Sequence, residues 1–190
     1  MSSLGCFGSG KTAIQSSRNE AQAFADHLNT VLNGTVTDSR LSLIALPGKA
    51  DVFELTRFVE GASVPLDLHG SPHRLFVRQI IEVVDGHCRT ESYAYRLQAG
   101  DSVQSWLIRW EYFRDPPKPD YAYPLAHVHA NGEWTSSEPL DRLHIPTRRV
   151  PLELVLWHLI AEWRVTPKTD GWKAVLGESV EGFDGRRTAH

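Results

Sequence analysis

Two alternating hydrophobic segments joined by Asp-Gly constrain the fold of this chain more than any other feature. The segment RLFVRQIIEVV (74–84) is followed by Asp85-Gly86 and then by HCRTESYAYRL (87–97). An apolar–polar period of two predicts strands, because successive strand side chains point to opposite faces. Asp-Gly is a preferred pair for the tight turn of a hairpin. We therefore expect an antiparallel sheet that contains this hairpin.

A third strand is predicted directly after the hairpin, in VQSWLIRWEYF (103–113). Alternation places Trp106 and Trp110 on one face, which we expect to be part of the core. Arg109 and Glu111 lie on the other face, which either lines a cleft or faces solvent. In all, the patterns indicate about seven or eight strands. The remaining strand-like segments are 40–47, 51–60, 64–70, 121–129 and 142–146.

Two amphipathic helices are predicted near the ends of the chain. Ser17 and Glu20 form a capping box for the first, and Pro151 stands where a proline can open the second. The predicted class is α+β, with a bent, mainly antiparallel β-sheet flanked by these two helices. We expect residues 1–16 to be a flexible N-terminus, 17–165 a single α+β domain, and 166–190 a loosely packed C-terminal tail.

Composition excludes some classes of function. A net charge of −3 disfavours an extended nucleic-acid surface, although a small local basic site remains compatible with it. The sequence has no apolar run of the roughly 20 residues that a membrane helix needs, and no basic region followed by an apolar stretch that would indicate a secretory signal. With two cysteines, we expect no disulfide framework and a cytoplasmic location.

One nucleotide-binding motif is present by sequence match. Gly5 to Thr12 fits the phosphate-binding P-loop pattern G-x-x-x-x-G-K-[ST]. A functional P-loop follows a buried strand, and the four residues before Gly5, two of them serine, cannot supply one. We interpret the match as a coincidence.

The clearest candidates for chemistry are histidines in LAHVHANGEW (125–134) and LHIPTRR (143–149). His127 and His129 are two residues apart in a predicted strand, so their side chains share a face, and His144 lies on a nearby segment. Neighbouring imidazoles either bind a metal or exchange protons near neutral pH. The alternative is two solvent-facing strand histidines with an incidental neighbour.

A metal site would use a divalent transition metal. His127-x-His129-x-x-x-Glu133 resembles the first half of the cupin metal motif, although the second half is absent. A two-residue turn at Asn131-Gly132 would direct Glu133 away from the histidines, whereas a three-residue loop would pair it with His129.

A metal-free site would need a base, an acid and a cation beside a phosphate, as in RNA cleavage through the 2′-hydroxyl. His127, His129 and His144 are the candidates for proton transfer and require no cofactor. The candidates for phosphate contacts are Arg109, Arg148 and Arg149.

The stretch LIRWEYFRDPPKPDYAYPLAHVHANG also resembles a known family. Arg109, a proline-containing loop and a His127-x-His129 pair occur in the order seen in TumE-type toxins of bacterial toxin–antitoxin systems, and the resemblance covers roughly residues 93–163. It implies a toxin acting on RNA as a ribonuclease, with a cognate antitoxin protein as partner. A non-catalytic interaction module, using Leu107 and Phe113 or the tail, is a further hypothesis, and the sequence leaves the oligomeric state open.

Overall fold

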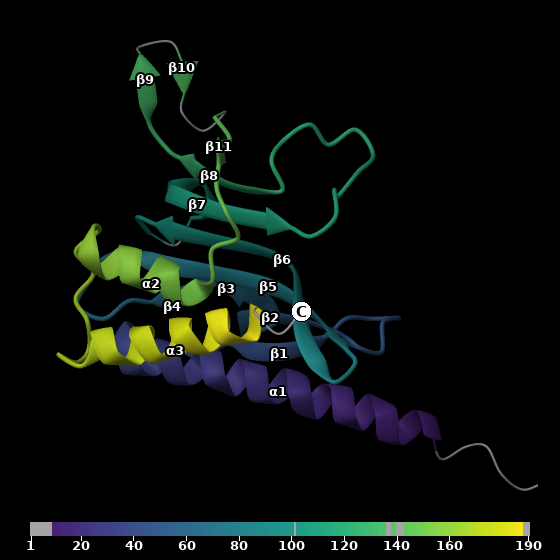
Figure 1. Ribbon diagram of the computed structural model, residues 1–190. Helices are drawn as coiled ribbons and strands as arrows, with labels where there is room; N and C mark the ends of the chain where they lie inside the picture. Colours follow the sequence, from purple (N-terminus) through teal and green to yellow (C-terminus); the bar gives the residue numbers. More distant parts are fainter. Residues whose placement is uncertain (1–8, 101, 136–137, 140–142, 188–190) are drawn as a thin grey trace, which may run out of the picture.

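An open, nine-stranded antiparallel sheet forms the framework of the molecule, and three helices lie together on one of its faces (Figure 1). The structure is a computed structural model that describes residues 9–100, 102–135, 138–139 and 143–187. The predicted α+β class with an antiparallel sheet is confirmed. Among the described helices, none is both long enough and apolar enough to cross a membrane.

The strands of the sheet follow the spatial order β1-β2-β5-β6-β7-β8-β11, with β3 paired to β2 and β4 paired to β5. A short 3₁₀ turn, η1 (Val103–Ser105), leads into β7, and β9 and β10 form a separate two-stranded sheet. The bounds are β1 (Ser42–Ala45), β2 (Val52–Val59), β3 (Ala62–Val64), β4 (Leu66–Asp67), β5 (Arg74–Val84), β6 (His87–Gln98), β7 (Trp106–Phe113), β8 (Ala126–Ala130), β9 (Glu133–Thr135), β10 (Glu138–Pro139) and β11 (Ile145–Pro146).

The predicted hairpin is present as β5 and β6, with Val84 paired to His87 across the turn. Asp85 and Gly86 have φ angles of 51° and 76°. Positive φ at both central residues is what the mirror-image hairpin turn requires, and Asp and Gly are among the residues that tolerate it.

The core lies between the sheet and the helices α1 (Ser9–Thr35), α2 (Leu152–Ala161) and α3 (Trp172–Arg187). Alternate residues of β5, β6 and β7 face the helices and are buried, which follows from the period of two in their sequences. The other face of these strands carries no helix, and polar side chains of β5, β6 and β7, among them Arg78, Arg96 and Arg109, lie on it. The buried sheet residues include Leu75, Val77, Tyr93, Tyr95, Leu97 and Trp110.

The first helix begins earlier than predicted. It starts at Ser9, so Ser17 and Glu20 lie within it and do not cap it. Residues 11–16 hold no glycine or proline that would stop a helix, and Lys11, Ala13 and Gln15 are good helix formers. The P-loop match falls partly outside the described residues, and its last four residues, 9–12, are helical.

The expected loose tail contains the third helix, α3, which packs on α1 and α2. Leu176 is fully buried, and Ser179 is buried at helical spacing from it. Gly177 and Gly182 within this helix obscure its short apolar stripe in the sequence, but tertiary packing compensates for their low helix propensity.

The turn predicted at Asn131-Gly132 does not form a hairpin. The Asn131 N–H donates to Leu107 O at 2.8 Å, and its side-chain Nδ2 donates to Trp106 O at 2.7 Å. These bonds hold Asn131 beside β7, and the chain then leaves the main sheet to form β9 and β10 (Figure 1). The strand predicted from residue 121 begins at Ala126, after a loop with four prolines.

A polar contact joins the three helices inside the core. The Glu153 carboxylate on α2 accepts a hydrogen bond from Ser179 Oγ of α3 at 2.8 Å, and His27 Nε2 of α1 lies 3.5 Å from the same oxygen. Burial opposes ionisation of Glu153, but the hydrogen bonds from His27 and Ser179 outweigh it and lower the pKa of this carboxyl group.

We expect Glu153→Gln to lower the free energy of unfolding at pH 7 by about 1–3 kcal/mol, because it removes a buried charge from its partners. A carboxyl group whose pKa is lowered by folding stabilises the protein above its unfolded pKa, and this contribution disappears as the pH falls through the folded pKa. Urea denaturation should therefore show the two proteins converging below about pH 4. Glu178→Gln, on the exposed side of α3, is the control and should have little effect. An undiminished difference at pH 3 would contradict this account.

Candidate functional site

The three predicted histidines meet on the face of the sheet that the helices leave uncovered. The register of β7 and β8 pairs Arg109 with His129 and Glu111 with His127. β11 pairs with β8 so that Ile145 is opposite Val128, and the same register places His144 opposite His129. Because strand side chains alternate, these groups all lie on the face opposite Trp110 and Val128.

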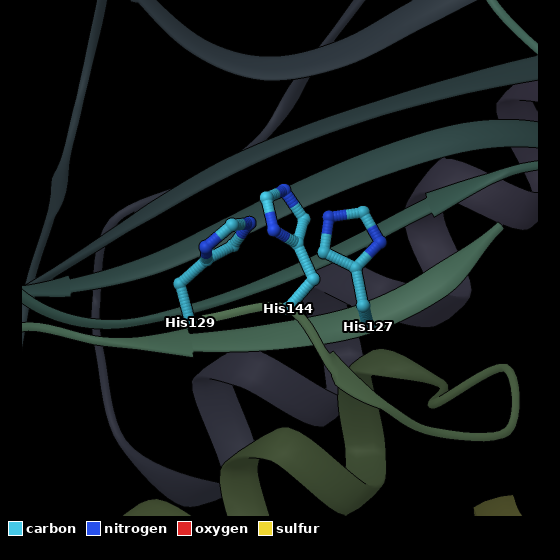
Figure 2. Close-up of side chains that lie close together, drawn as sticks. All are labelled: His127, His129 and His144. Carbon is cyan, nitrogen blue, oxygen red and sulfur yellow. The ribbon is translucent and has the colours of Figure 1, made fainter. Parts of the chain in front are cut away.

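The imidazoles of the three histidines form a compact group (Figure 2). One ring nitrogen from each can be chosen so that all three lie within 4.8 Å of one another. The ring centroids are 4.9 Å apart for His127 and His129, 4.9 Å for His127 and His144, and 4.3 Å for His129 and His144. His127 and His129 are each 1% exposed, whereas His144 is half-buried. Two of the three imidazoles are therefore enclosed by the fold, and His144 is the most accessible of them.

The protonation of His127 is restricted by its backbone contact. Its Nδ1 lies 2.7 Å from the carbonyl oxygen of Pro124. A carbonyl only accepts hydrogen bonds, so Nδ1 carries the proton, and in the neutral ring Nε2 presents a lone pair. That Nε2 faces Glu111 Oε2 at 3.3 Å, which is also an acceptor. A proton or a metal cation between the two atoms is needed to make this contact favourable.

Glu111 connects the histidines to Arg109. Its Oε2 lies 3.3 Å from His127 Nε2 and 3.4 Å from His129 Nε2, and its Oε1 lies 3.3 Å from Arg109 Nε. One carboxylate therefore contacts two imidazoles through one oxygen and a guanidinium through the other. This arrangement concentrates negative charge at the centre of the group and positive charge beside it.

Aromatic side chains surround the histidines. The ring of Tyr123 stacks on His144 with centroids 3.7 Å apart, although Tyr123 is itself 51% exposed. Tyr121 packs edge-on against Tyr123, and both burial and the charge of Glu111 raise the pKa of its phenol. These tyrosines come from the proline-containing loop between β7 and β8, which therefore forms one wall of the site.

Trp106 lies in this site, whereas alternation predicted it in the core. Its ring is 6.4 Å from that of His129. The register between β6 and β7 shifts at Leu97 and Gln98, so that Leu107 is the extra residue of a bulge. An extra residue reverses the alternation on one side of it, and Trp106 therefore joins the face of Arg109.

The histidine group has the composition of a three-ligand metal site. In a tetrahedral zinc site with Zn–N distances of about 2.0–2.1 Å, the ligand nitrogens are about 3.3 Å apart. The ligand nitrogens of the three histidines lie within 4.8 Å of one another, so they would have to approach by up to about 1.5 Å to hold one ion. The bond from His127 Nδ1 to Pro124 is the kind of second contact that orients a metal-binding imidazole.

The other candidate residues are placed differently. Arg109 lies beside the histidines, and Arg148 is exposed between β11 and α2. Arg149 lies on the helix-covered side, where it donates to Thr90 Oγ1 at 2.9 Å and stacks 5.7 Å from the Tyr112 ring, and burial lowers its pKa. The structure therefore does not bring Arg149 to the histidines. The side chain of Glu133 lies outside the described residues.

Sequence reasoning did not assign Glu111 and Tyr123 to the site. The alternation in β7 did place Glu111 on the face of Arg109, but the register between β7 and β8 is needed to bring it to the histidines. Comparison of the chain with protein-family models, curated proteins and solved structures gave no match. The function is therefore inferred from the residues of the site.

We expect metal-free Glu111→Gln at pH 8 to unfold with a free energy within about 1 kcal/mol of the wild-type value. The amide can present an N–H to His127 Nε2, and the ion pair lost with Arg109 is partly exposed and contributes little. Urea denaturation at pH 8 measures this, with Glu153→Gln as a buried carboxylate for which a larger loss is expected. A loss above about 2 kcal/mol would indicate that Glu111 pairs with a protonated imidazole instead.

Proposed function

We propose that this protein binds one divalent transition metal through His127, His129 and His144, and that the resulting centre is hydrolytic. One observation carries this proposal, and it lies within the cluster of three imidazoles. Because Nδ1 of His127 donates to the Pro124 carbonyl, Nε2 is an acceptor, and it faces a carboxylate oxygen of Glu111 at 3.3 Å. Two acceptors directed at one another are unfavourable, and a cation between them satisfies both.

The chemistry of the ligands points to the kind of metal. Neutral imidazole suits zinc, copper, iron and nickel, whereas magnesium and calcium prefer oxygen ligands. Three protein ligands leave a position for water or substrate, and a metal in such a site acidifies bound water and polarises a bound oxygen. Glu111 Oε2 lies 3.3 Å and 3.4 Å from two of the ligand nitrogens, so this carboxylate would share the cation with the imidazoles, and water or substrate would bind as a further ligand beside it.

We expect untagged protein to contain about one equivalent of metal, measured by mass spectrometry after dialysis, because three imidazoles form a complete ligand set. The double variant His127→Ala/His129→Ala should lose the metal while its circular dichroism stays native. His87→Ala removes an exposed histidine of β6 and is the matched control, with unchanged metal content. Equal metal in the double variant, or none in wild-type protein after reconstitution with zinc, would overturn the proposal.

A second candidate is a ribonuclease of the TumE toxin type that acts without metal. The same contact between His127 and Glu111 favours it, because a proton on His127 Nε2 would make this contact a hydrogen bond. An imidazolium at His127 would then be a general acid, and a neighbouring neutral imidazole would be a base. Arg109 supplies a cation beside them. Under this hypothesis RNA is the substrate, and a cognate antitoxin protein is the partner.

Chelation distinguishes the two candidates. A hydrolytic metal centre should lose its activity toward RNA or other phosphate esters after treatment with a chelator and regain it with zinc, whereas acid–base catalysis should persist without metal. The assay uses the chelated full chain and His127→Ala as the inactive reference. Cleavage of RNA by metal-free protein, absent in His127→Ala, would favour the ribonuclease.

A further inference from the structure

Arg96 of β6 is unusual among the arginines of the sheet. It has no carboxylate within the 4 Å limit of an ion pair among the residues that the structure describes. Its Cζ lies 4.2 Å from the centroid of the Phe76 ring, and its Nε is buried without a hydrogen bond to the described chain. The sheet arginines that do have a carboxylate partner are Arg57, Arg74, Arg78, Arg89 and Arg109.

A second positive charge lies directly beside Arg96. The register of β6 and β7 pairs Arg96 with Arg109 on the face that carries the histidines. Like charges opposite one another in a sheet are destabilising. Burial, and then the charge of Arg109, lower the pKa of Arg96. Glu111, which pairs with Arg109 at 3.3 Å and whose charge raises the pKa of Arg96, offsets only part of this repulsion.

The two arginines are continuous with the histidine group. Phe76, Arg96, Arg109 and His129 are successive partners across β5, β6, β7 and β8. Neighbouring strands are about 4.8 Å apart, so Arg109 is one strand and Arg96 two strands from His129. A ligand of a few atoms spans this distance.

We propose that Arg96 and Arg109 bind an oxyanion of the substrate, a phosphate or a carboxylate, beside the histidine centre. Guanidinium groups bind such oxyanions through paired, charge-assisted hydrogen bonds. An anion here relieves the repulsion between the two arginines and supplies the partner that Arg96 does not have within the described chain. The position of this anion next to a metal rests on the proposed function, whereas the anion site itself requires neither a metal nor the three histidines.

Neighbouring cations do not share this property. Arg78 lies on the same face, but its guanidinium donates to Glu54 Oε2 at 3.0 Å. Its charge is therefore already compensated. Arg78→Gln is a control because it removes a positive charge that is already paired with Glu54 and that acts on Arg96 less than Arg109 does.

The test is calorimetric titration of the full chain with inorganic phosphate and, separately, with acetate, in metal-free and zinc-loaded protein. We expect at least one of the two anions to bind the wild type, and the tighter one identifies the substrate class. Arg96→Met, which keeps the packing on Phe76, and Arg109→Gln should each weaken binding by about 10-fold or more. Arg78→Gln should bind as the wild type does. Circular dichroism establishes that each variant is folded, and Arg109→Gln is an independent variant in case Arg96→Met does not fold.

Failure of this inference is distinct from failure of the metal proposal. If neither anion binds either form of the protein, or if folded Arg96→Met binds as tightly as the wild type, the oxyanion site is overturned. A different result separates the two proposals: the chain binds no metal, but the metal-free protein binds phosphate or acetate, and Arg96→Met and Arg109→Gln weaken this binding as expected. That result would support the oxyanion site and overturn the metal centre.

Discussion

The register between β7 and β8 is the constraint on which the rest of the site depends. It places Arg109 opposite His129 and Glu111 opposite His127, while Trp110 and Val128 form the matching pair on the other face. Trp110 is buried in the core, so a slip of one residue would bring a histidine into the core and move Val128 to the open face. Hydrophobic burial on one side of the sheet thus fixes the positions of the polar groups on the other side. The loop between the two strands can vary freely only if it preserves this register.

The open face of the sheet carries charges that an isolated chain would not favour. Two buried imidazoles converge on one carboxylate oxygen, and two arginines oppose one another one strand away. Each arrangement lowers the stability of the folded protein when nothing is bound. A cation between the histidines and Glu111 would make the first favourable, and an anion at the arginines would make the second favourable. The two sites are adjacent, so a substrate whose anionic group occupies the arginines would place its neighbouring atoms at the histidine centre. Strained or uncompensated groups of this kind are concentrated at functional sites in proteins.

Local patterns predicted much of this structure, and non-local packing decided the rest. The Asp85-Gly86 hairpin was predictable because its turn and both strands are contiguous in sequence. The shared face of His127 and His129 followed from alternation alone. The position of Arg149 on the helix-covered side did not, since it depends on how residues 147–150 cross from β11 to α2. The bulge at Leu107 and the packing of α3 are likewise set by contacts between distant segments, and neither leaves a clear local signal. Arg96 was missed for the same reason, because its isolation from carboxylates is a property of three neighbouring strands.

The central claim is that three imidazoles from β8 and the segment before β11 share one metal ion. X-ray absorption spectroscopy of the zinc-loaded chain at the zinc edge tests it most directly. We expect a first shell of nitrogen or oxygen atoms at about 2.0–2.1 Å with the outer-shell scattering of three imidazole rings, reduced to two rings in His144→Ala. A first shell containing sulfur, or one without imidazole scattering, would contradict the assignment of the metal to these histidines.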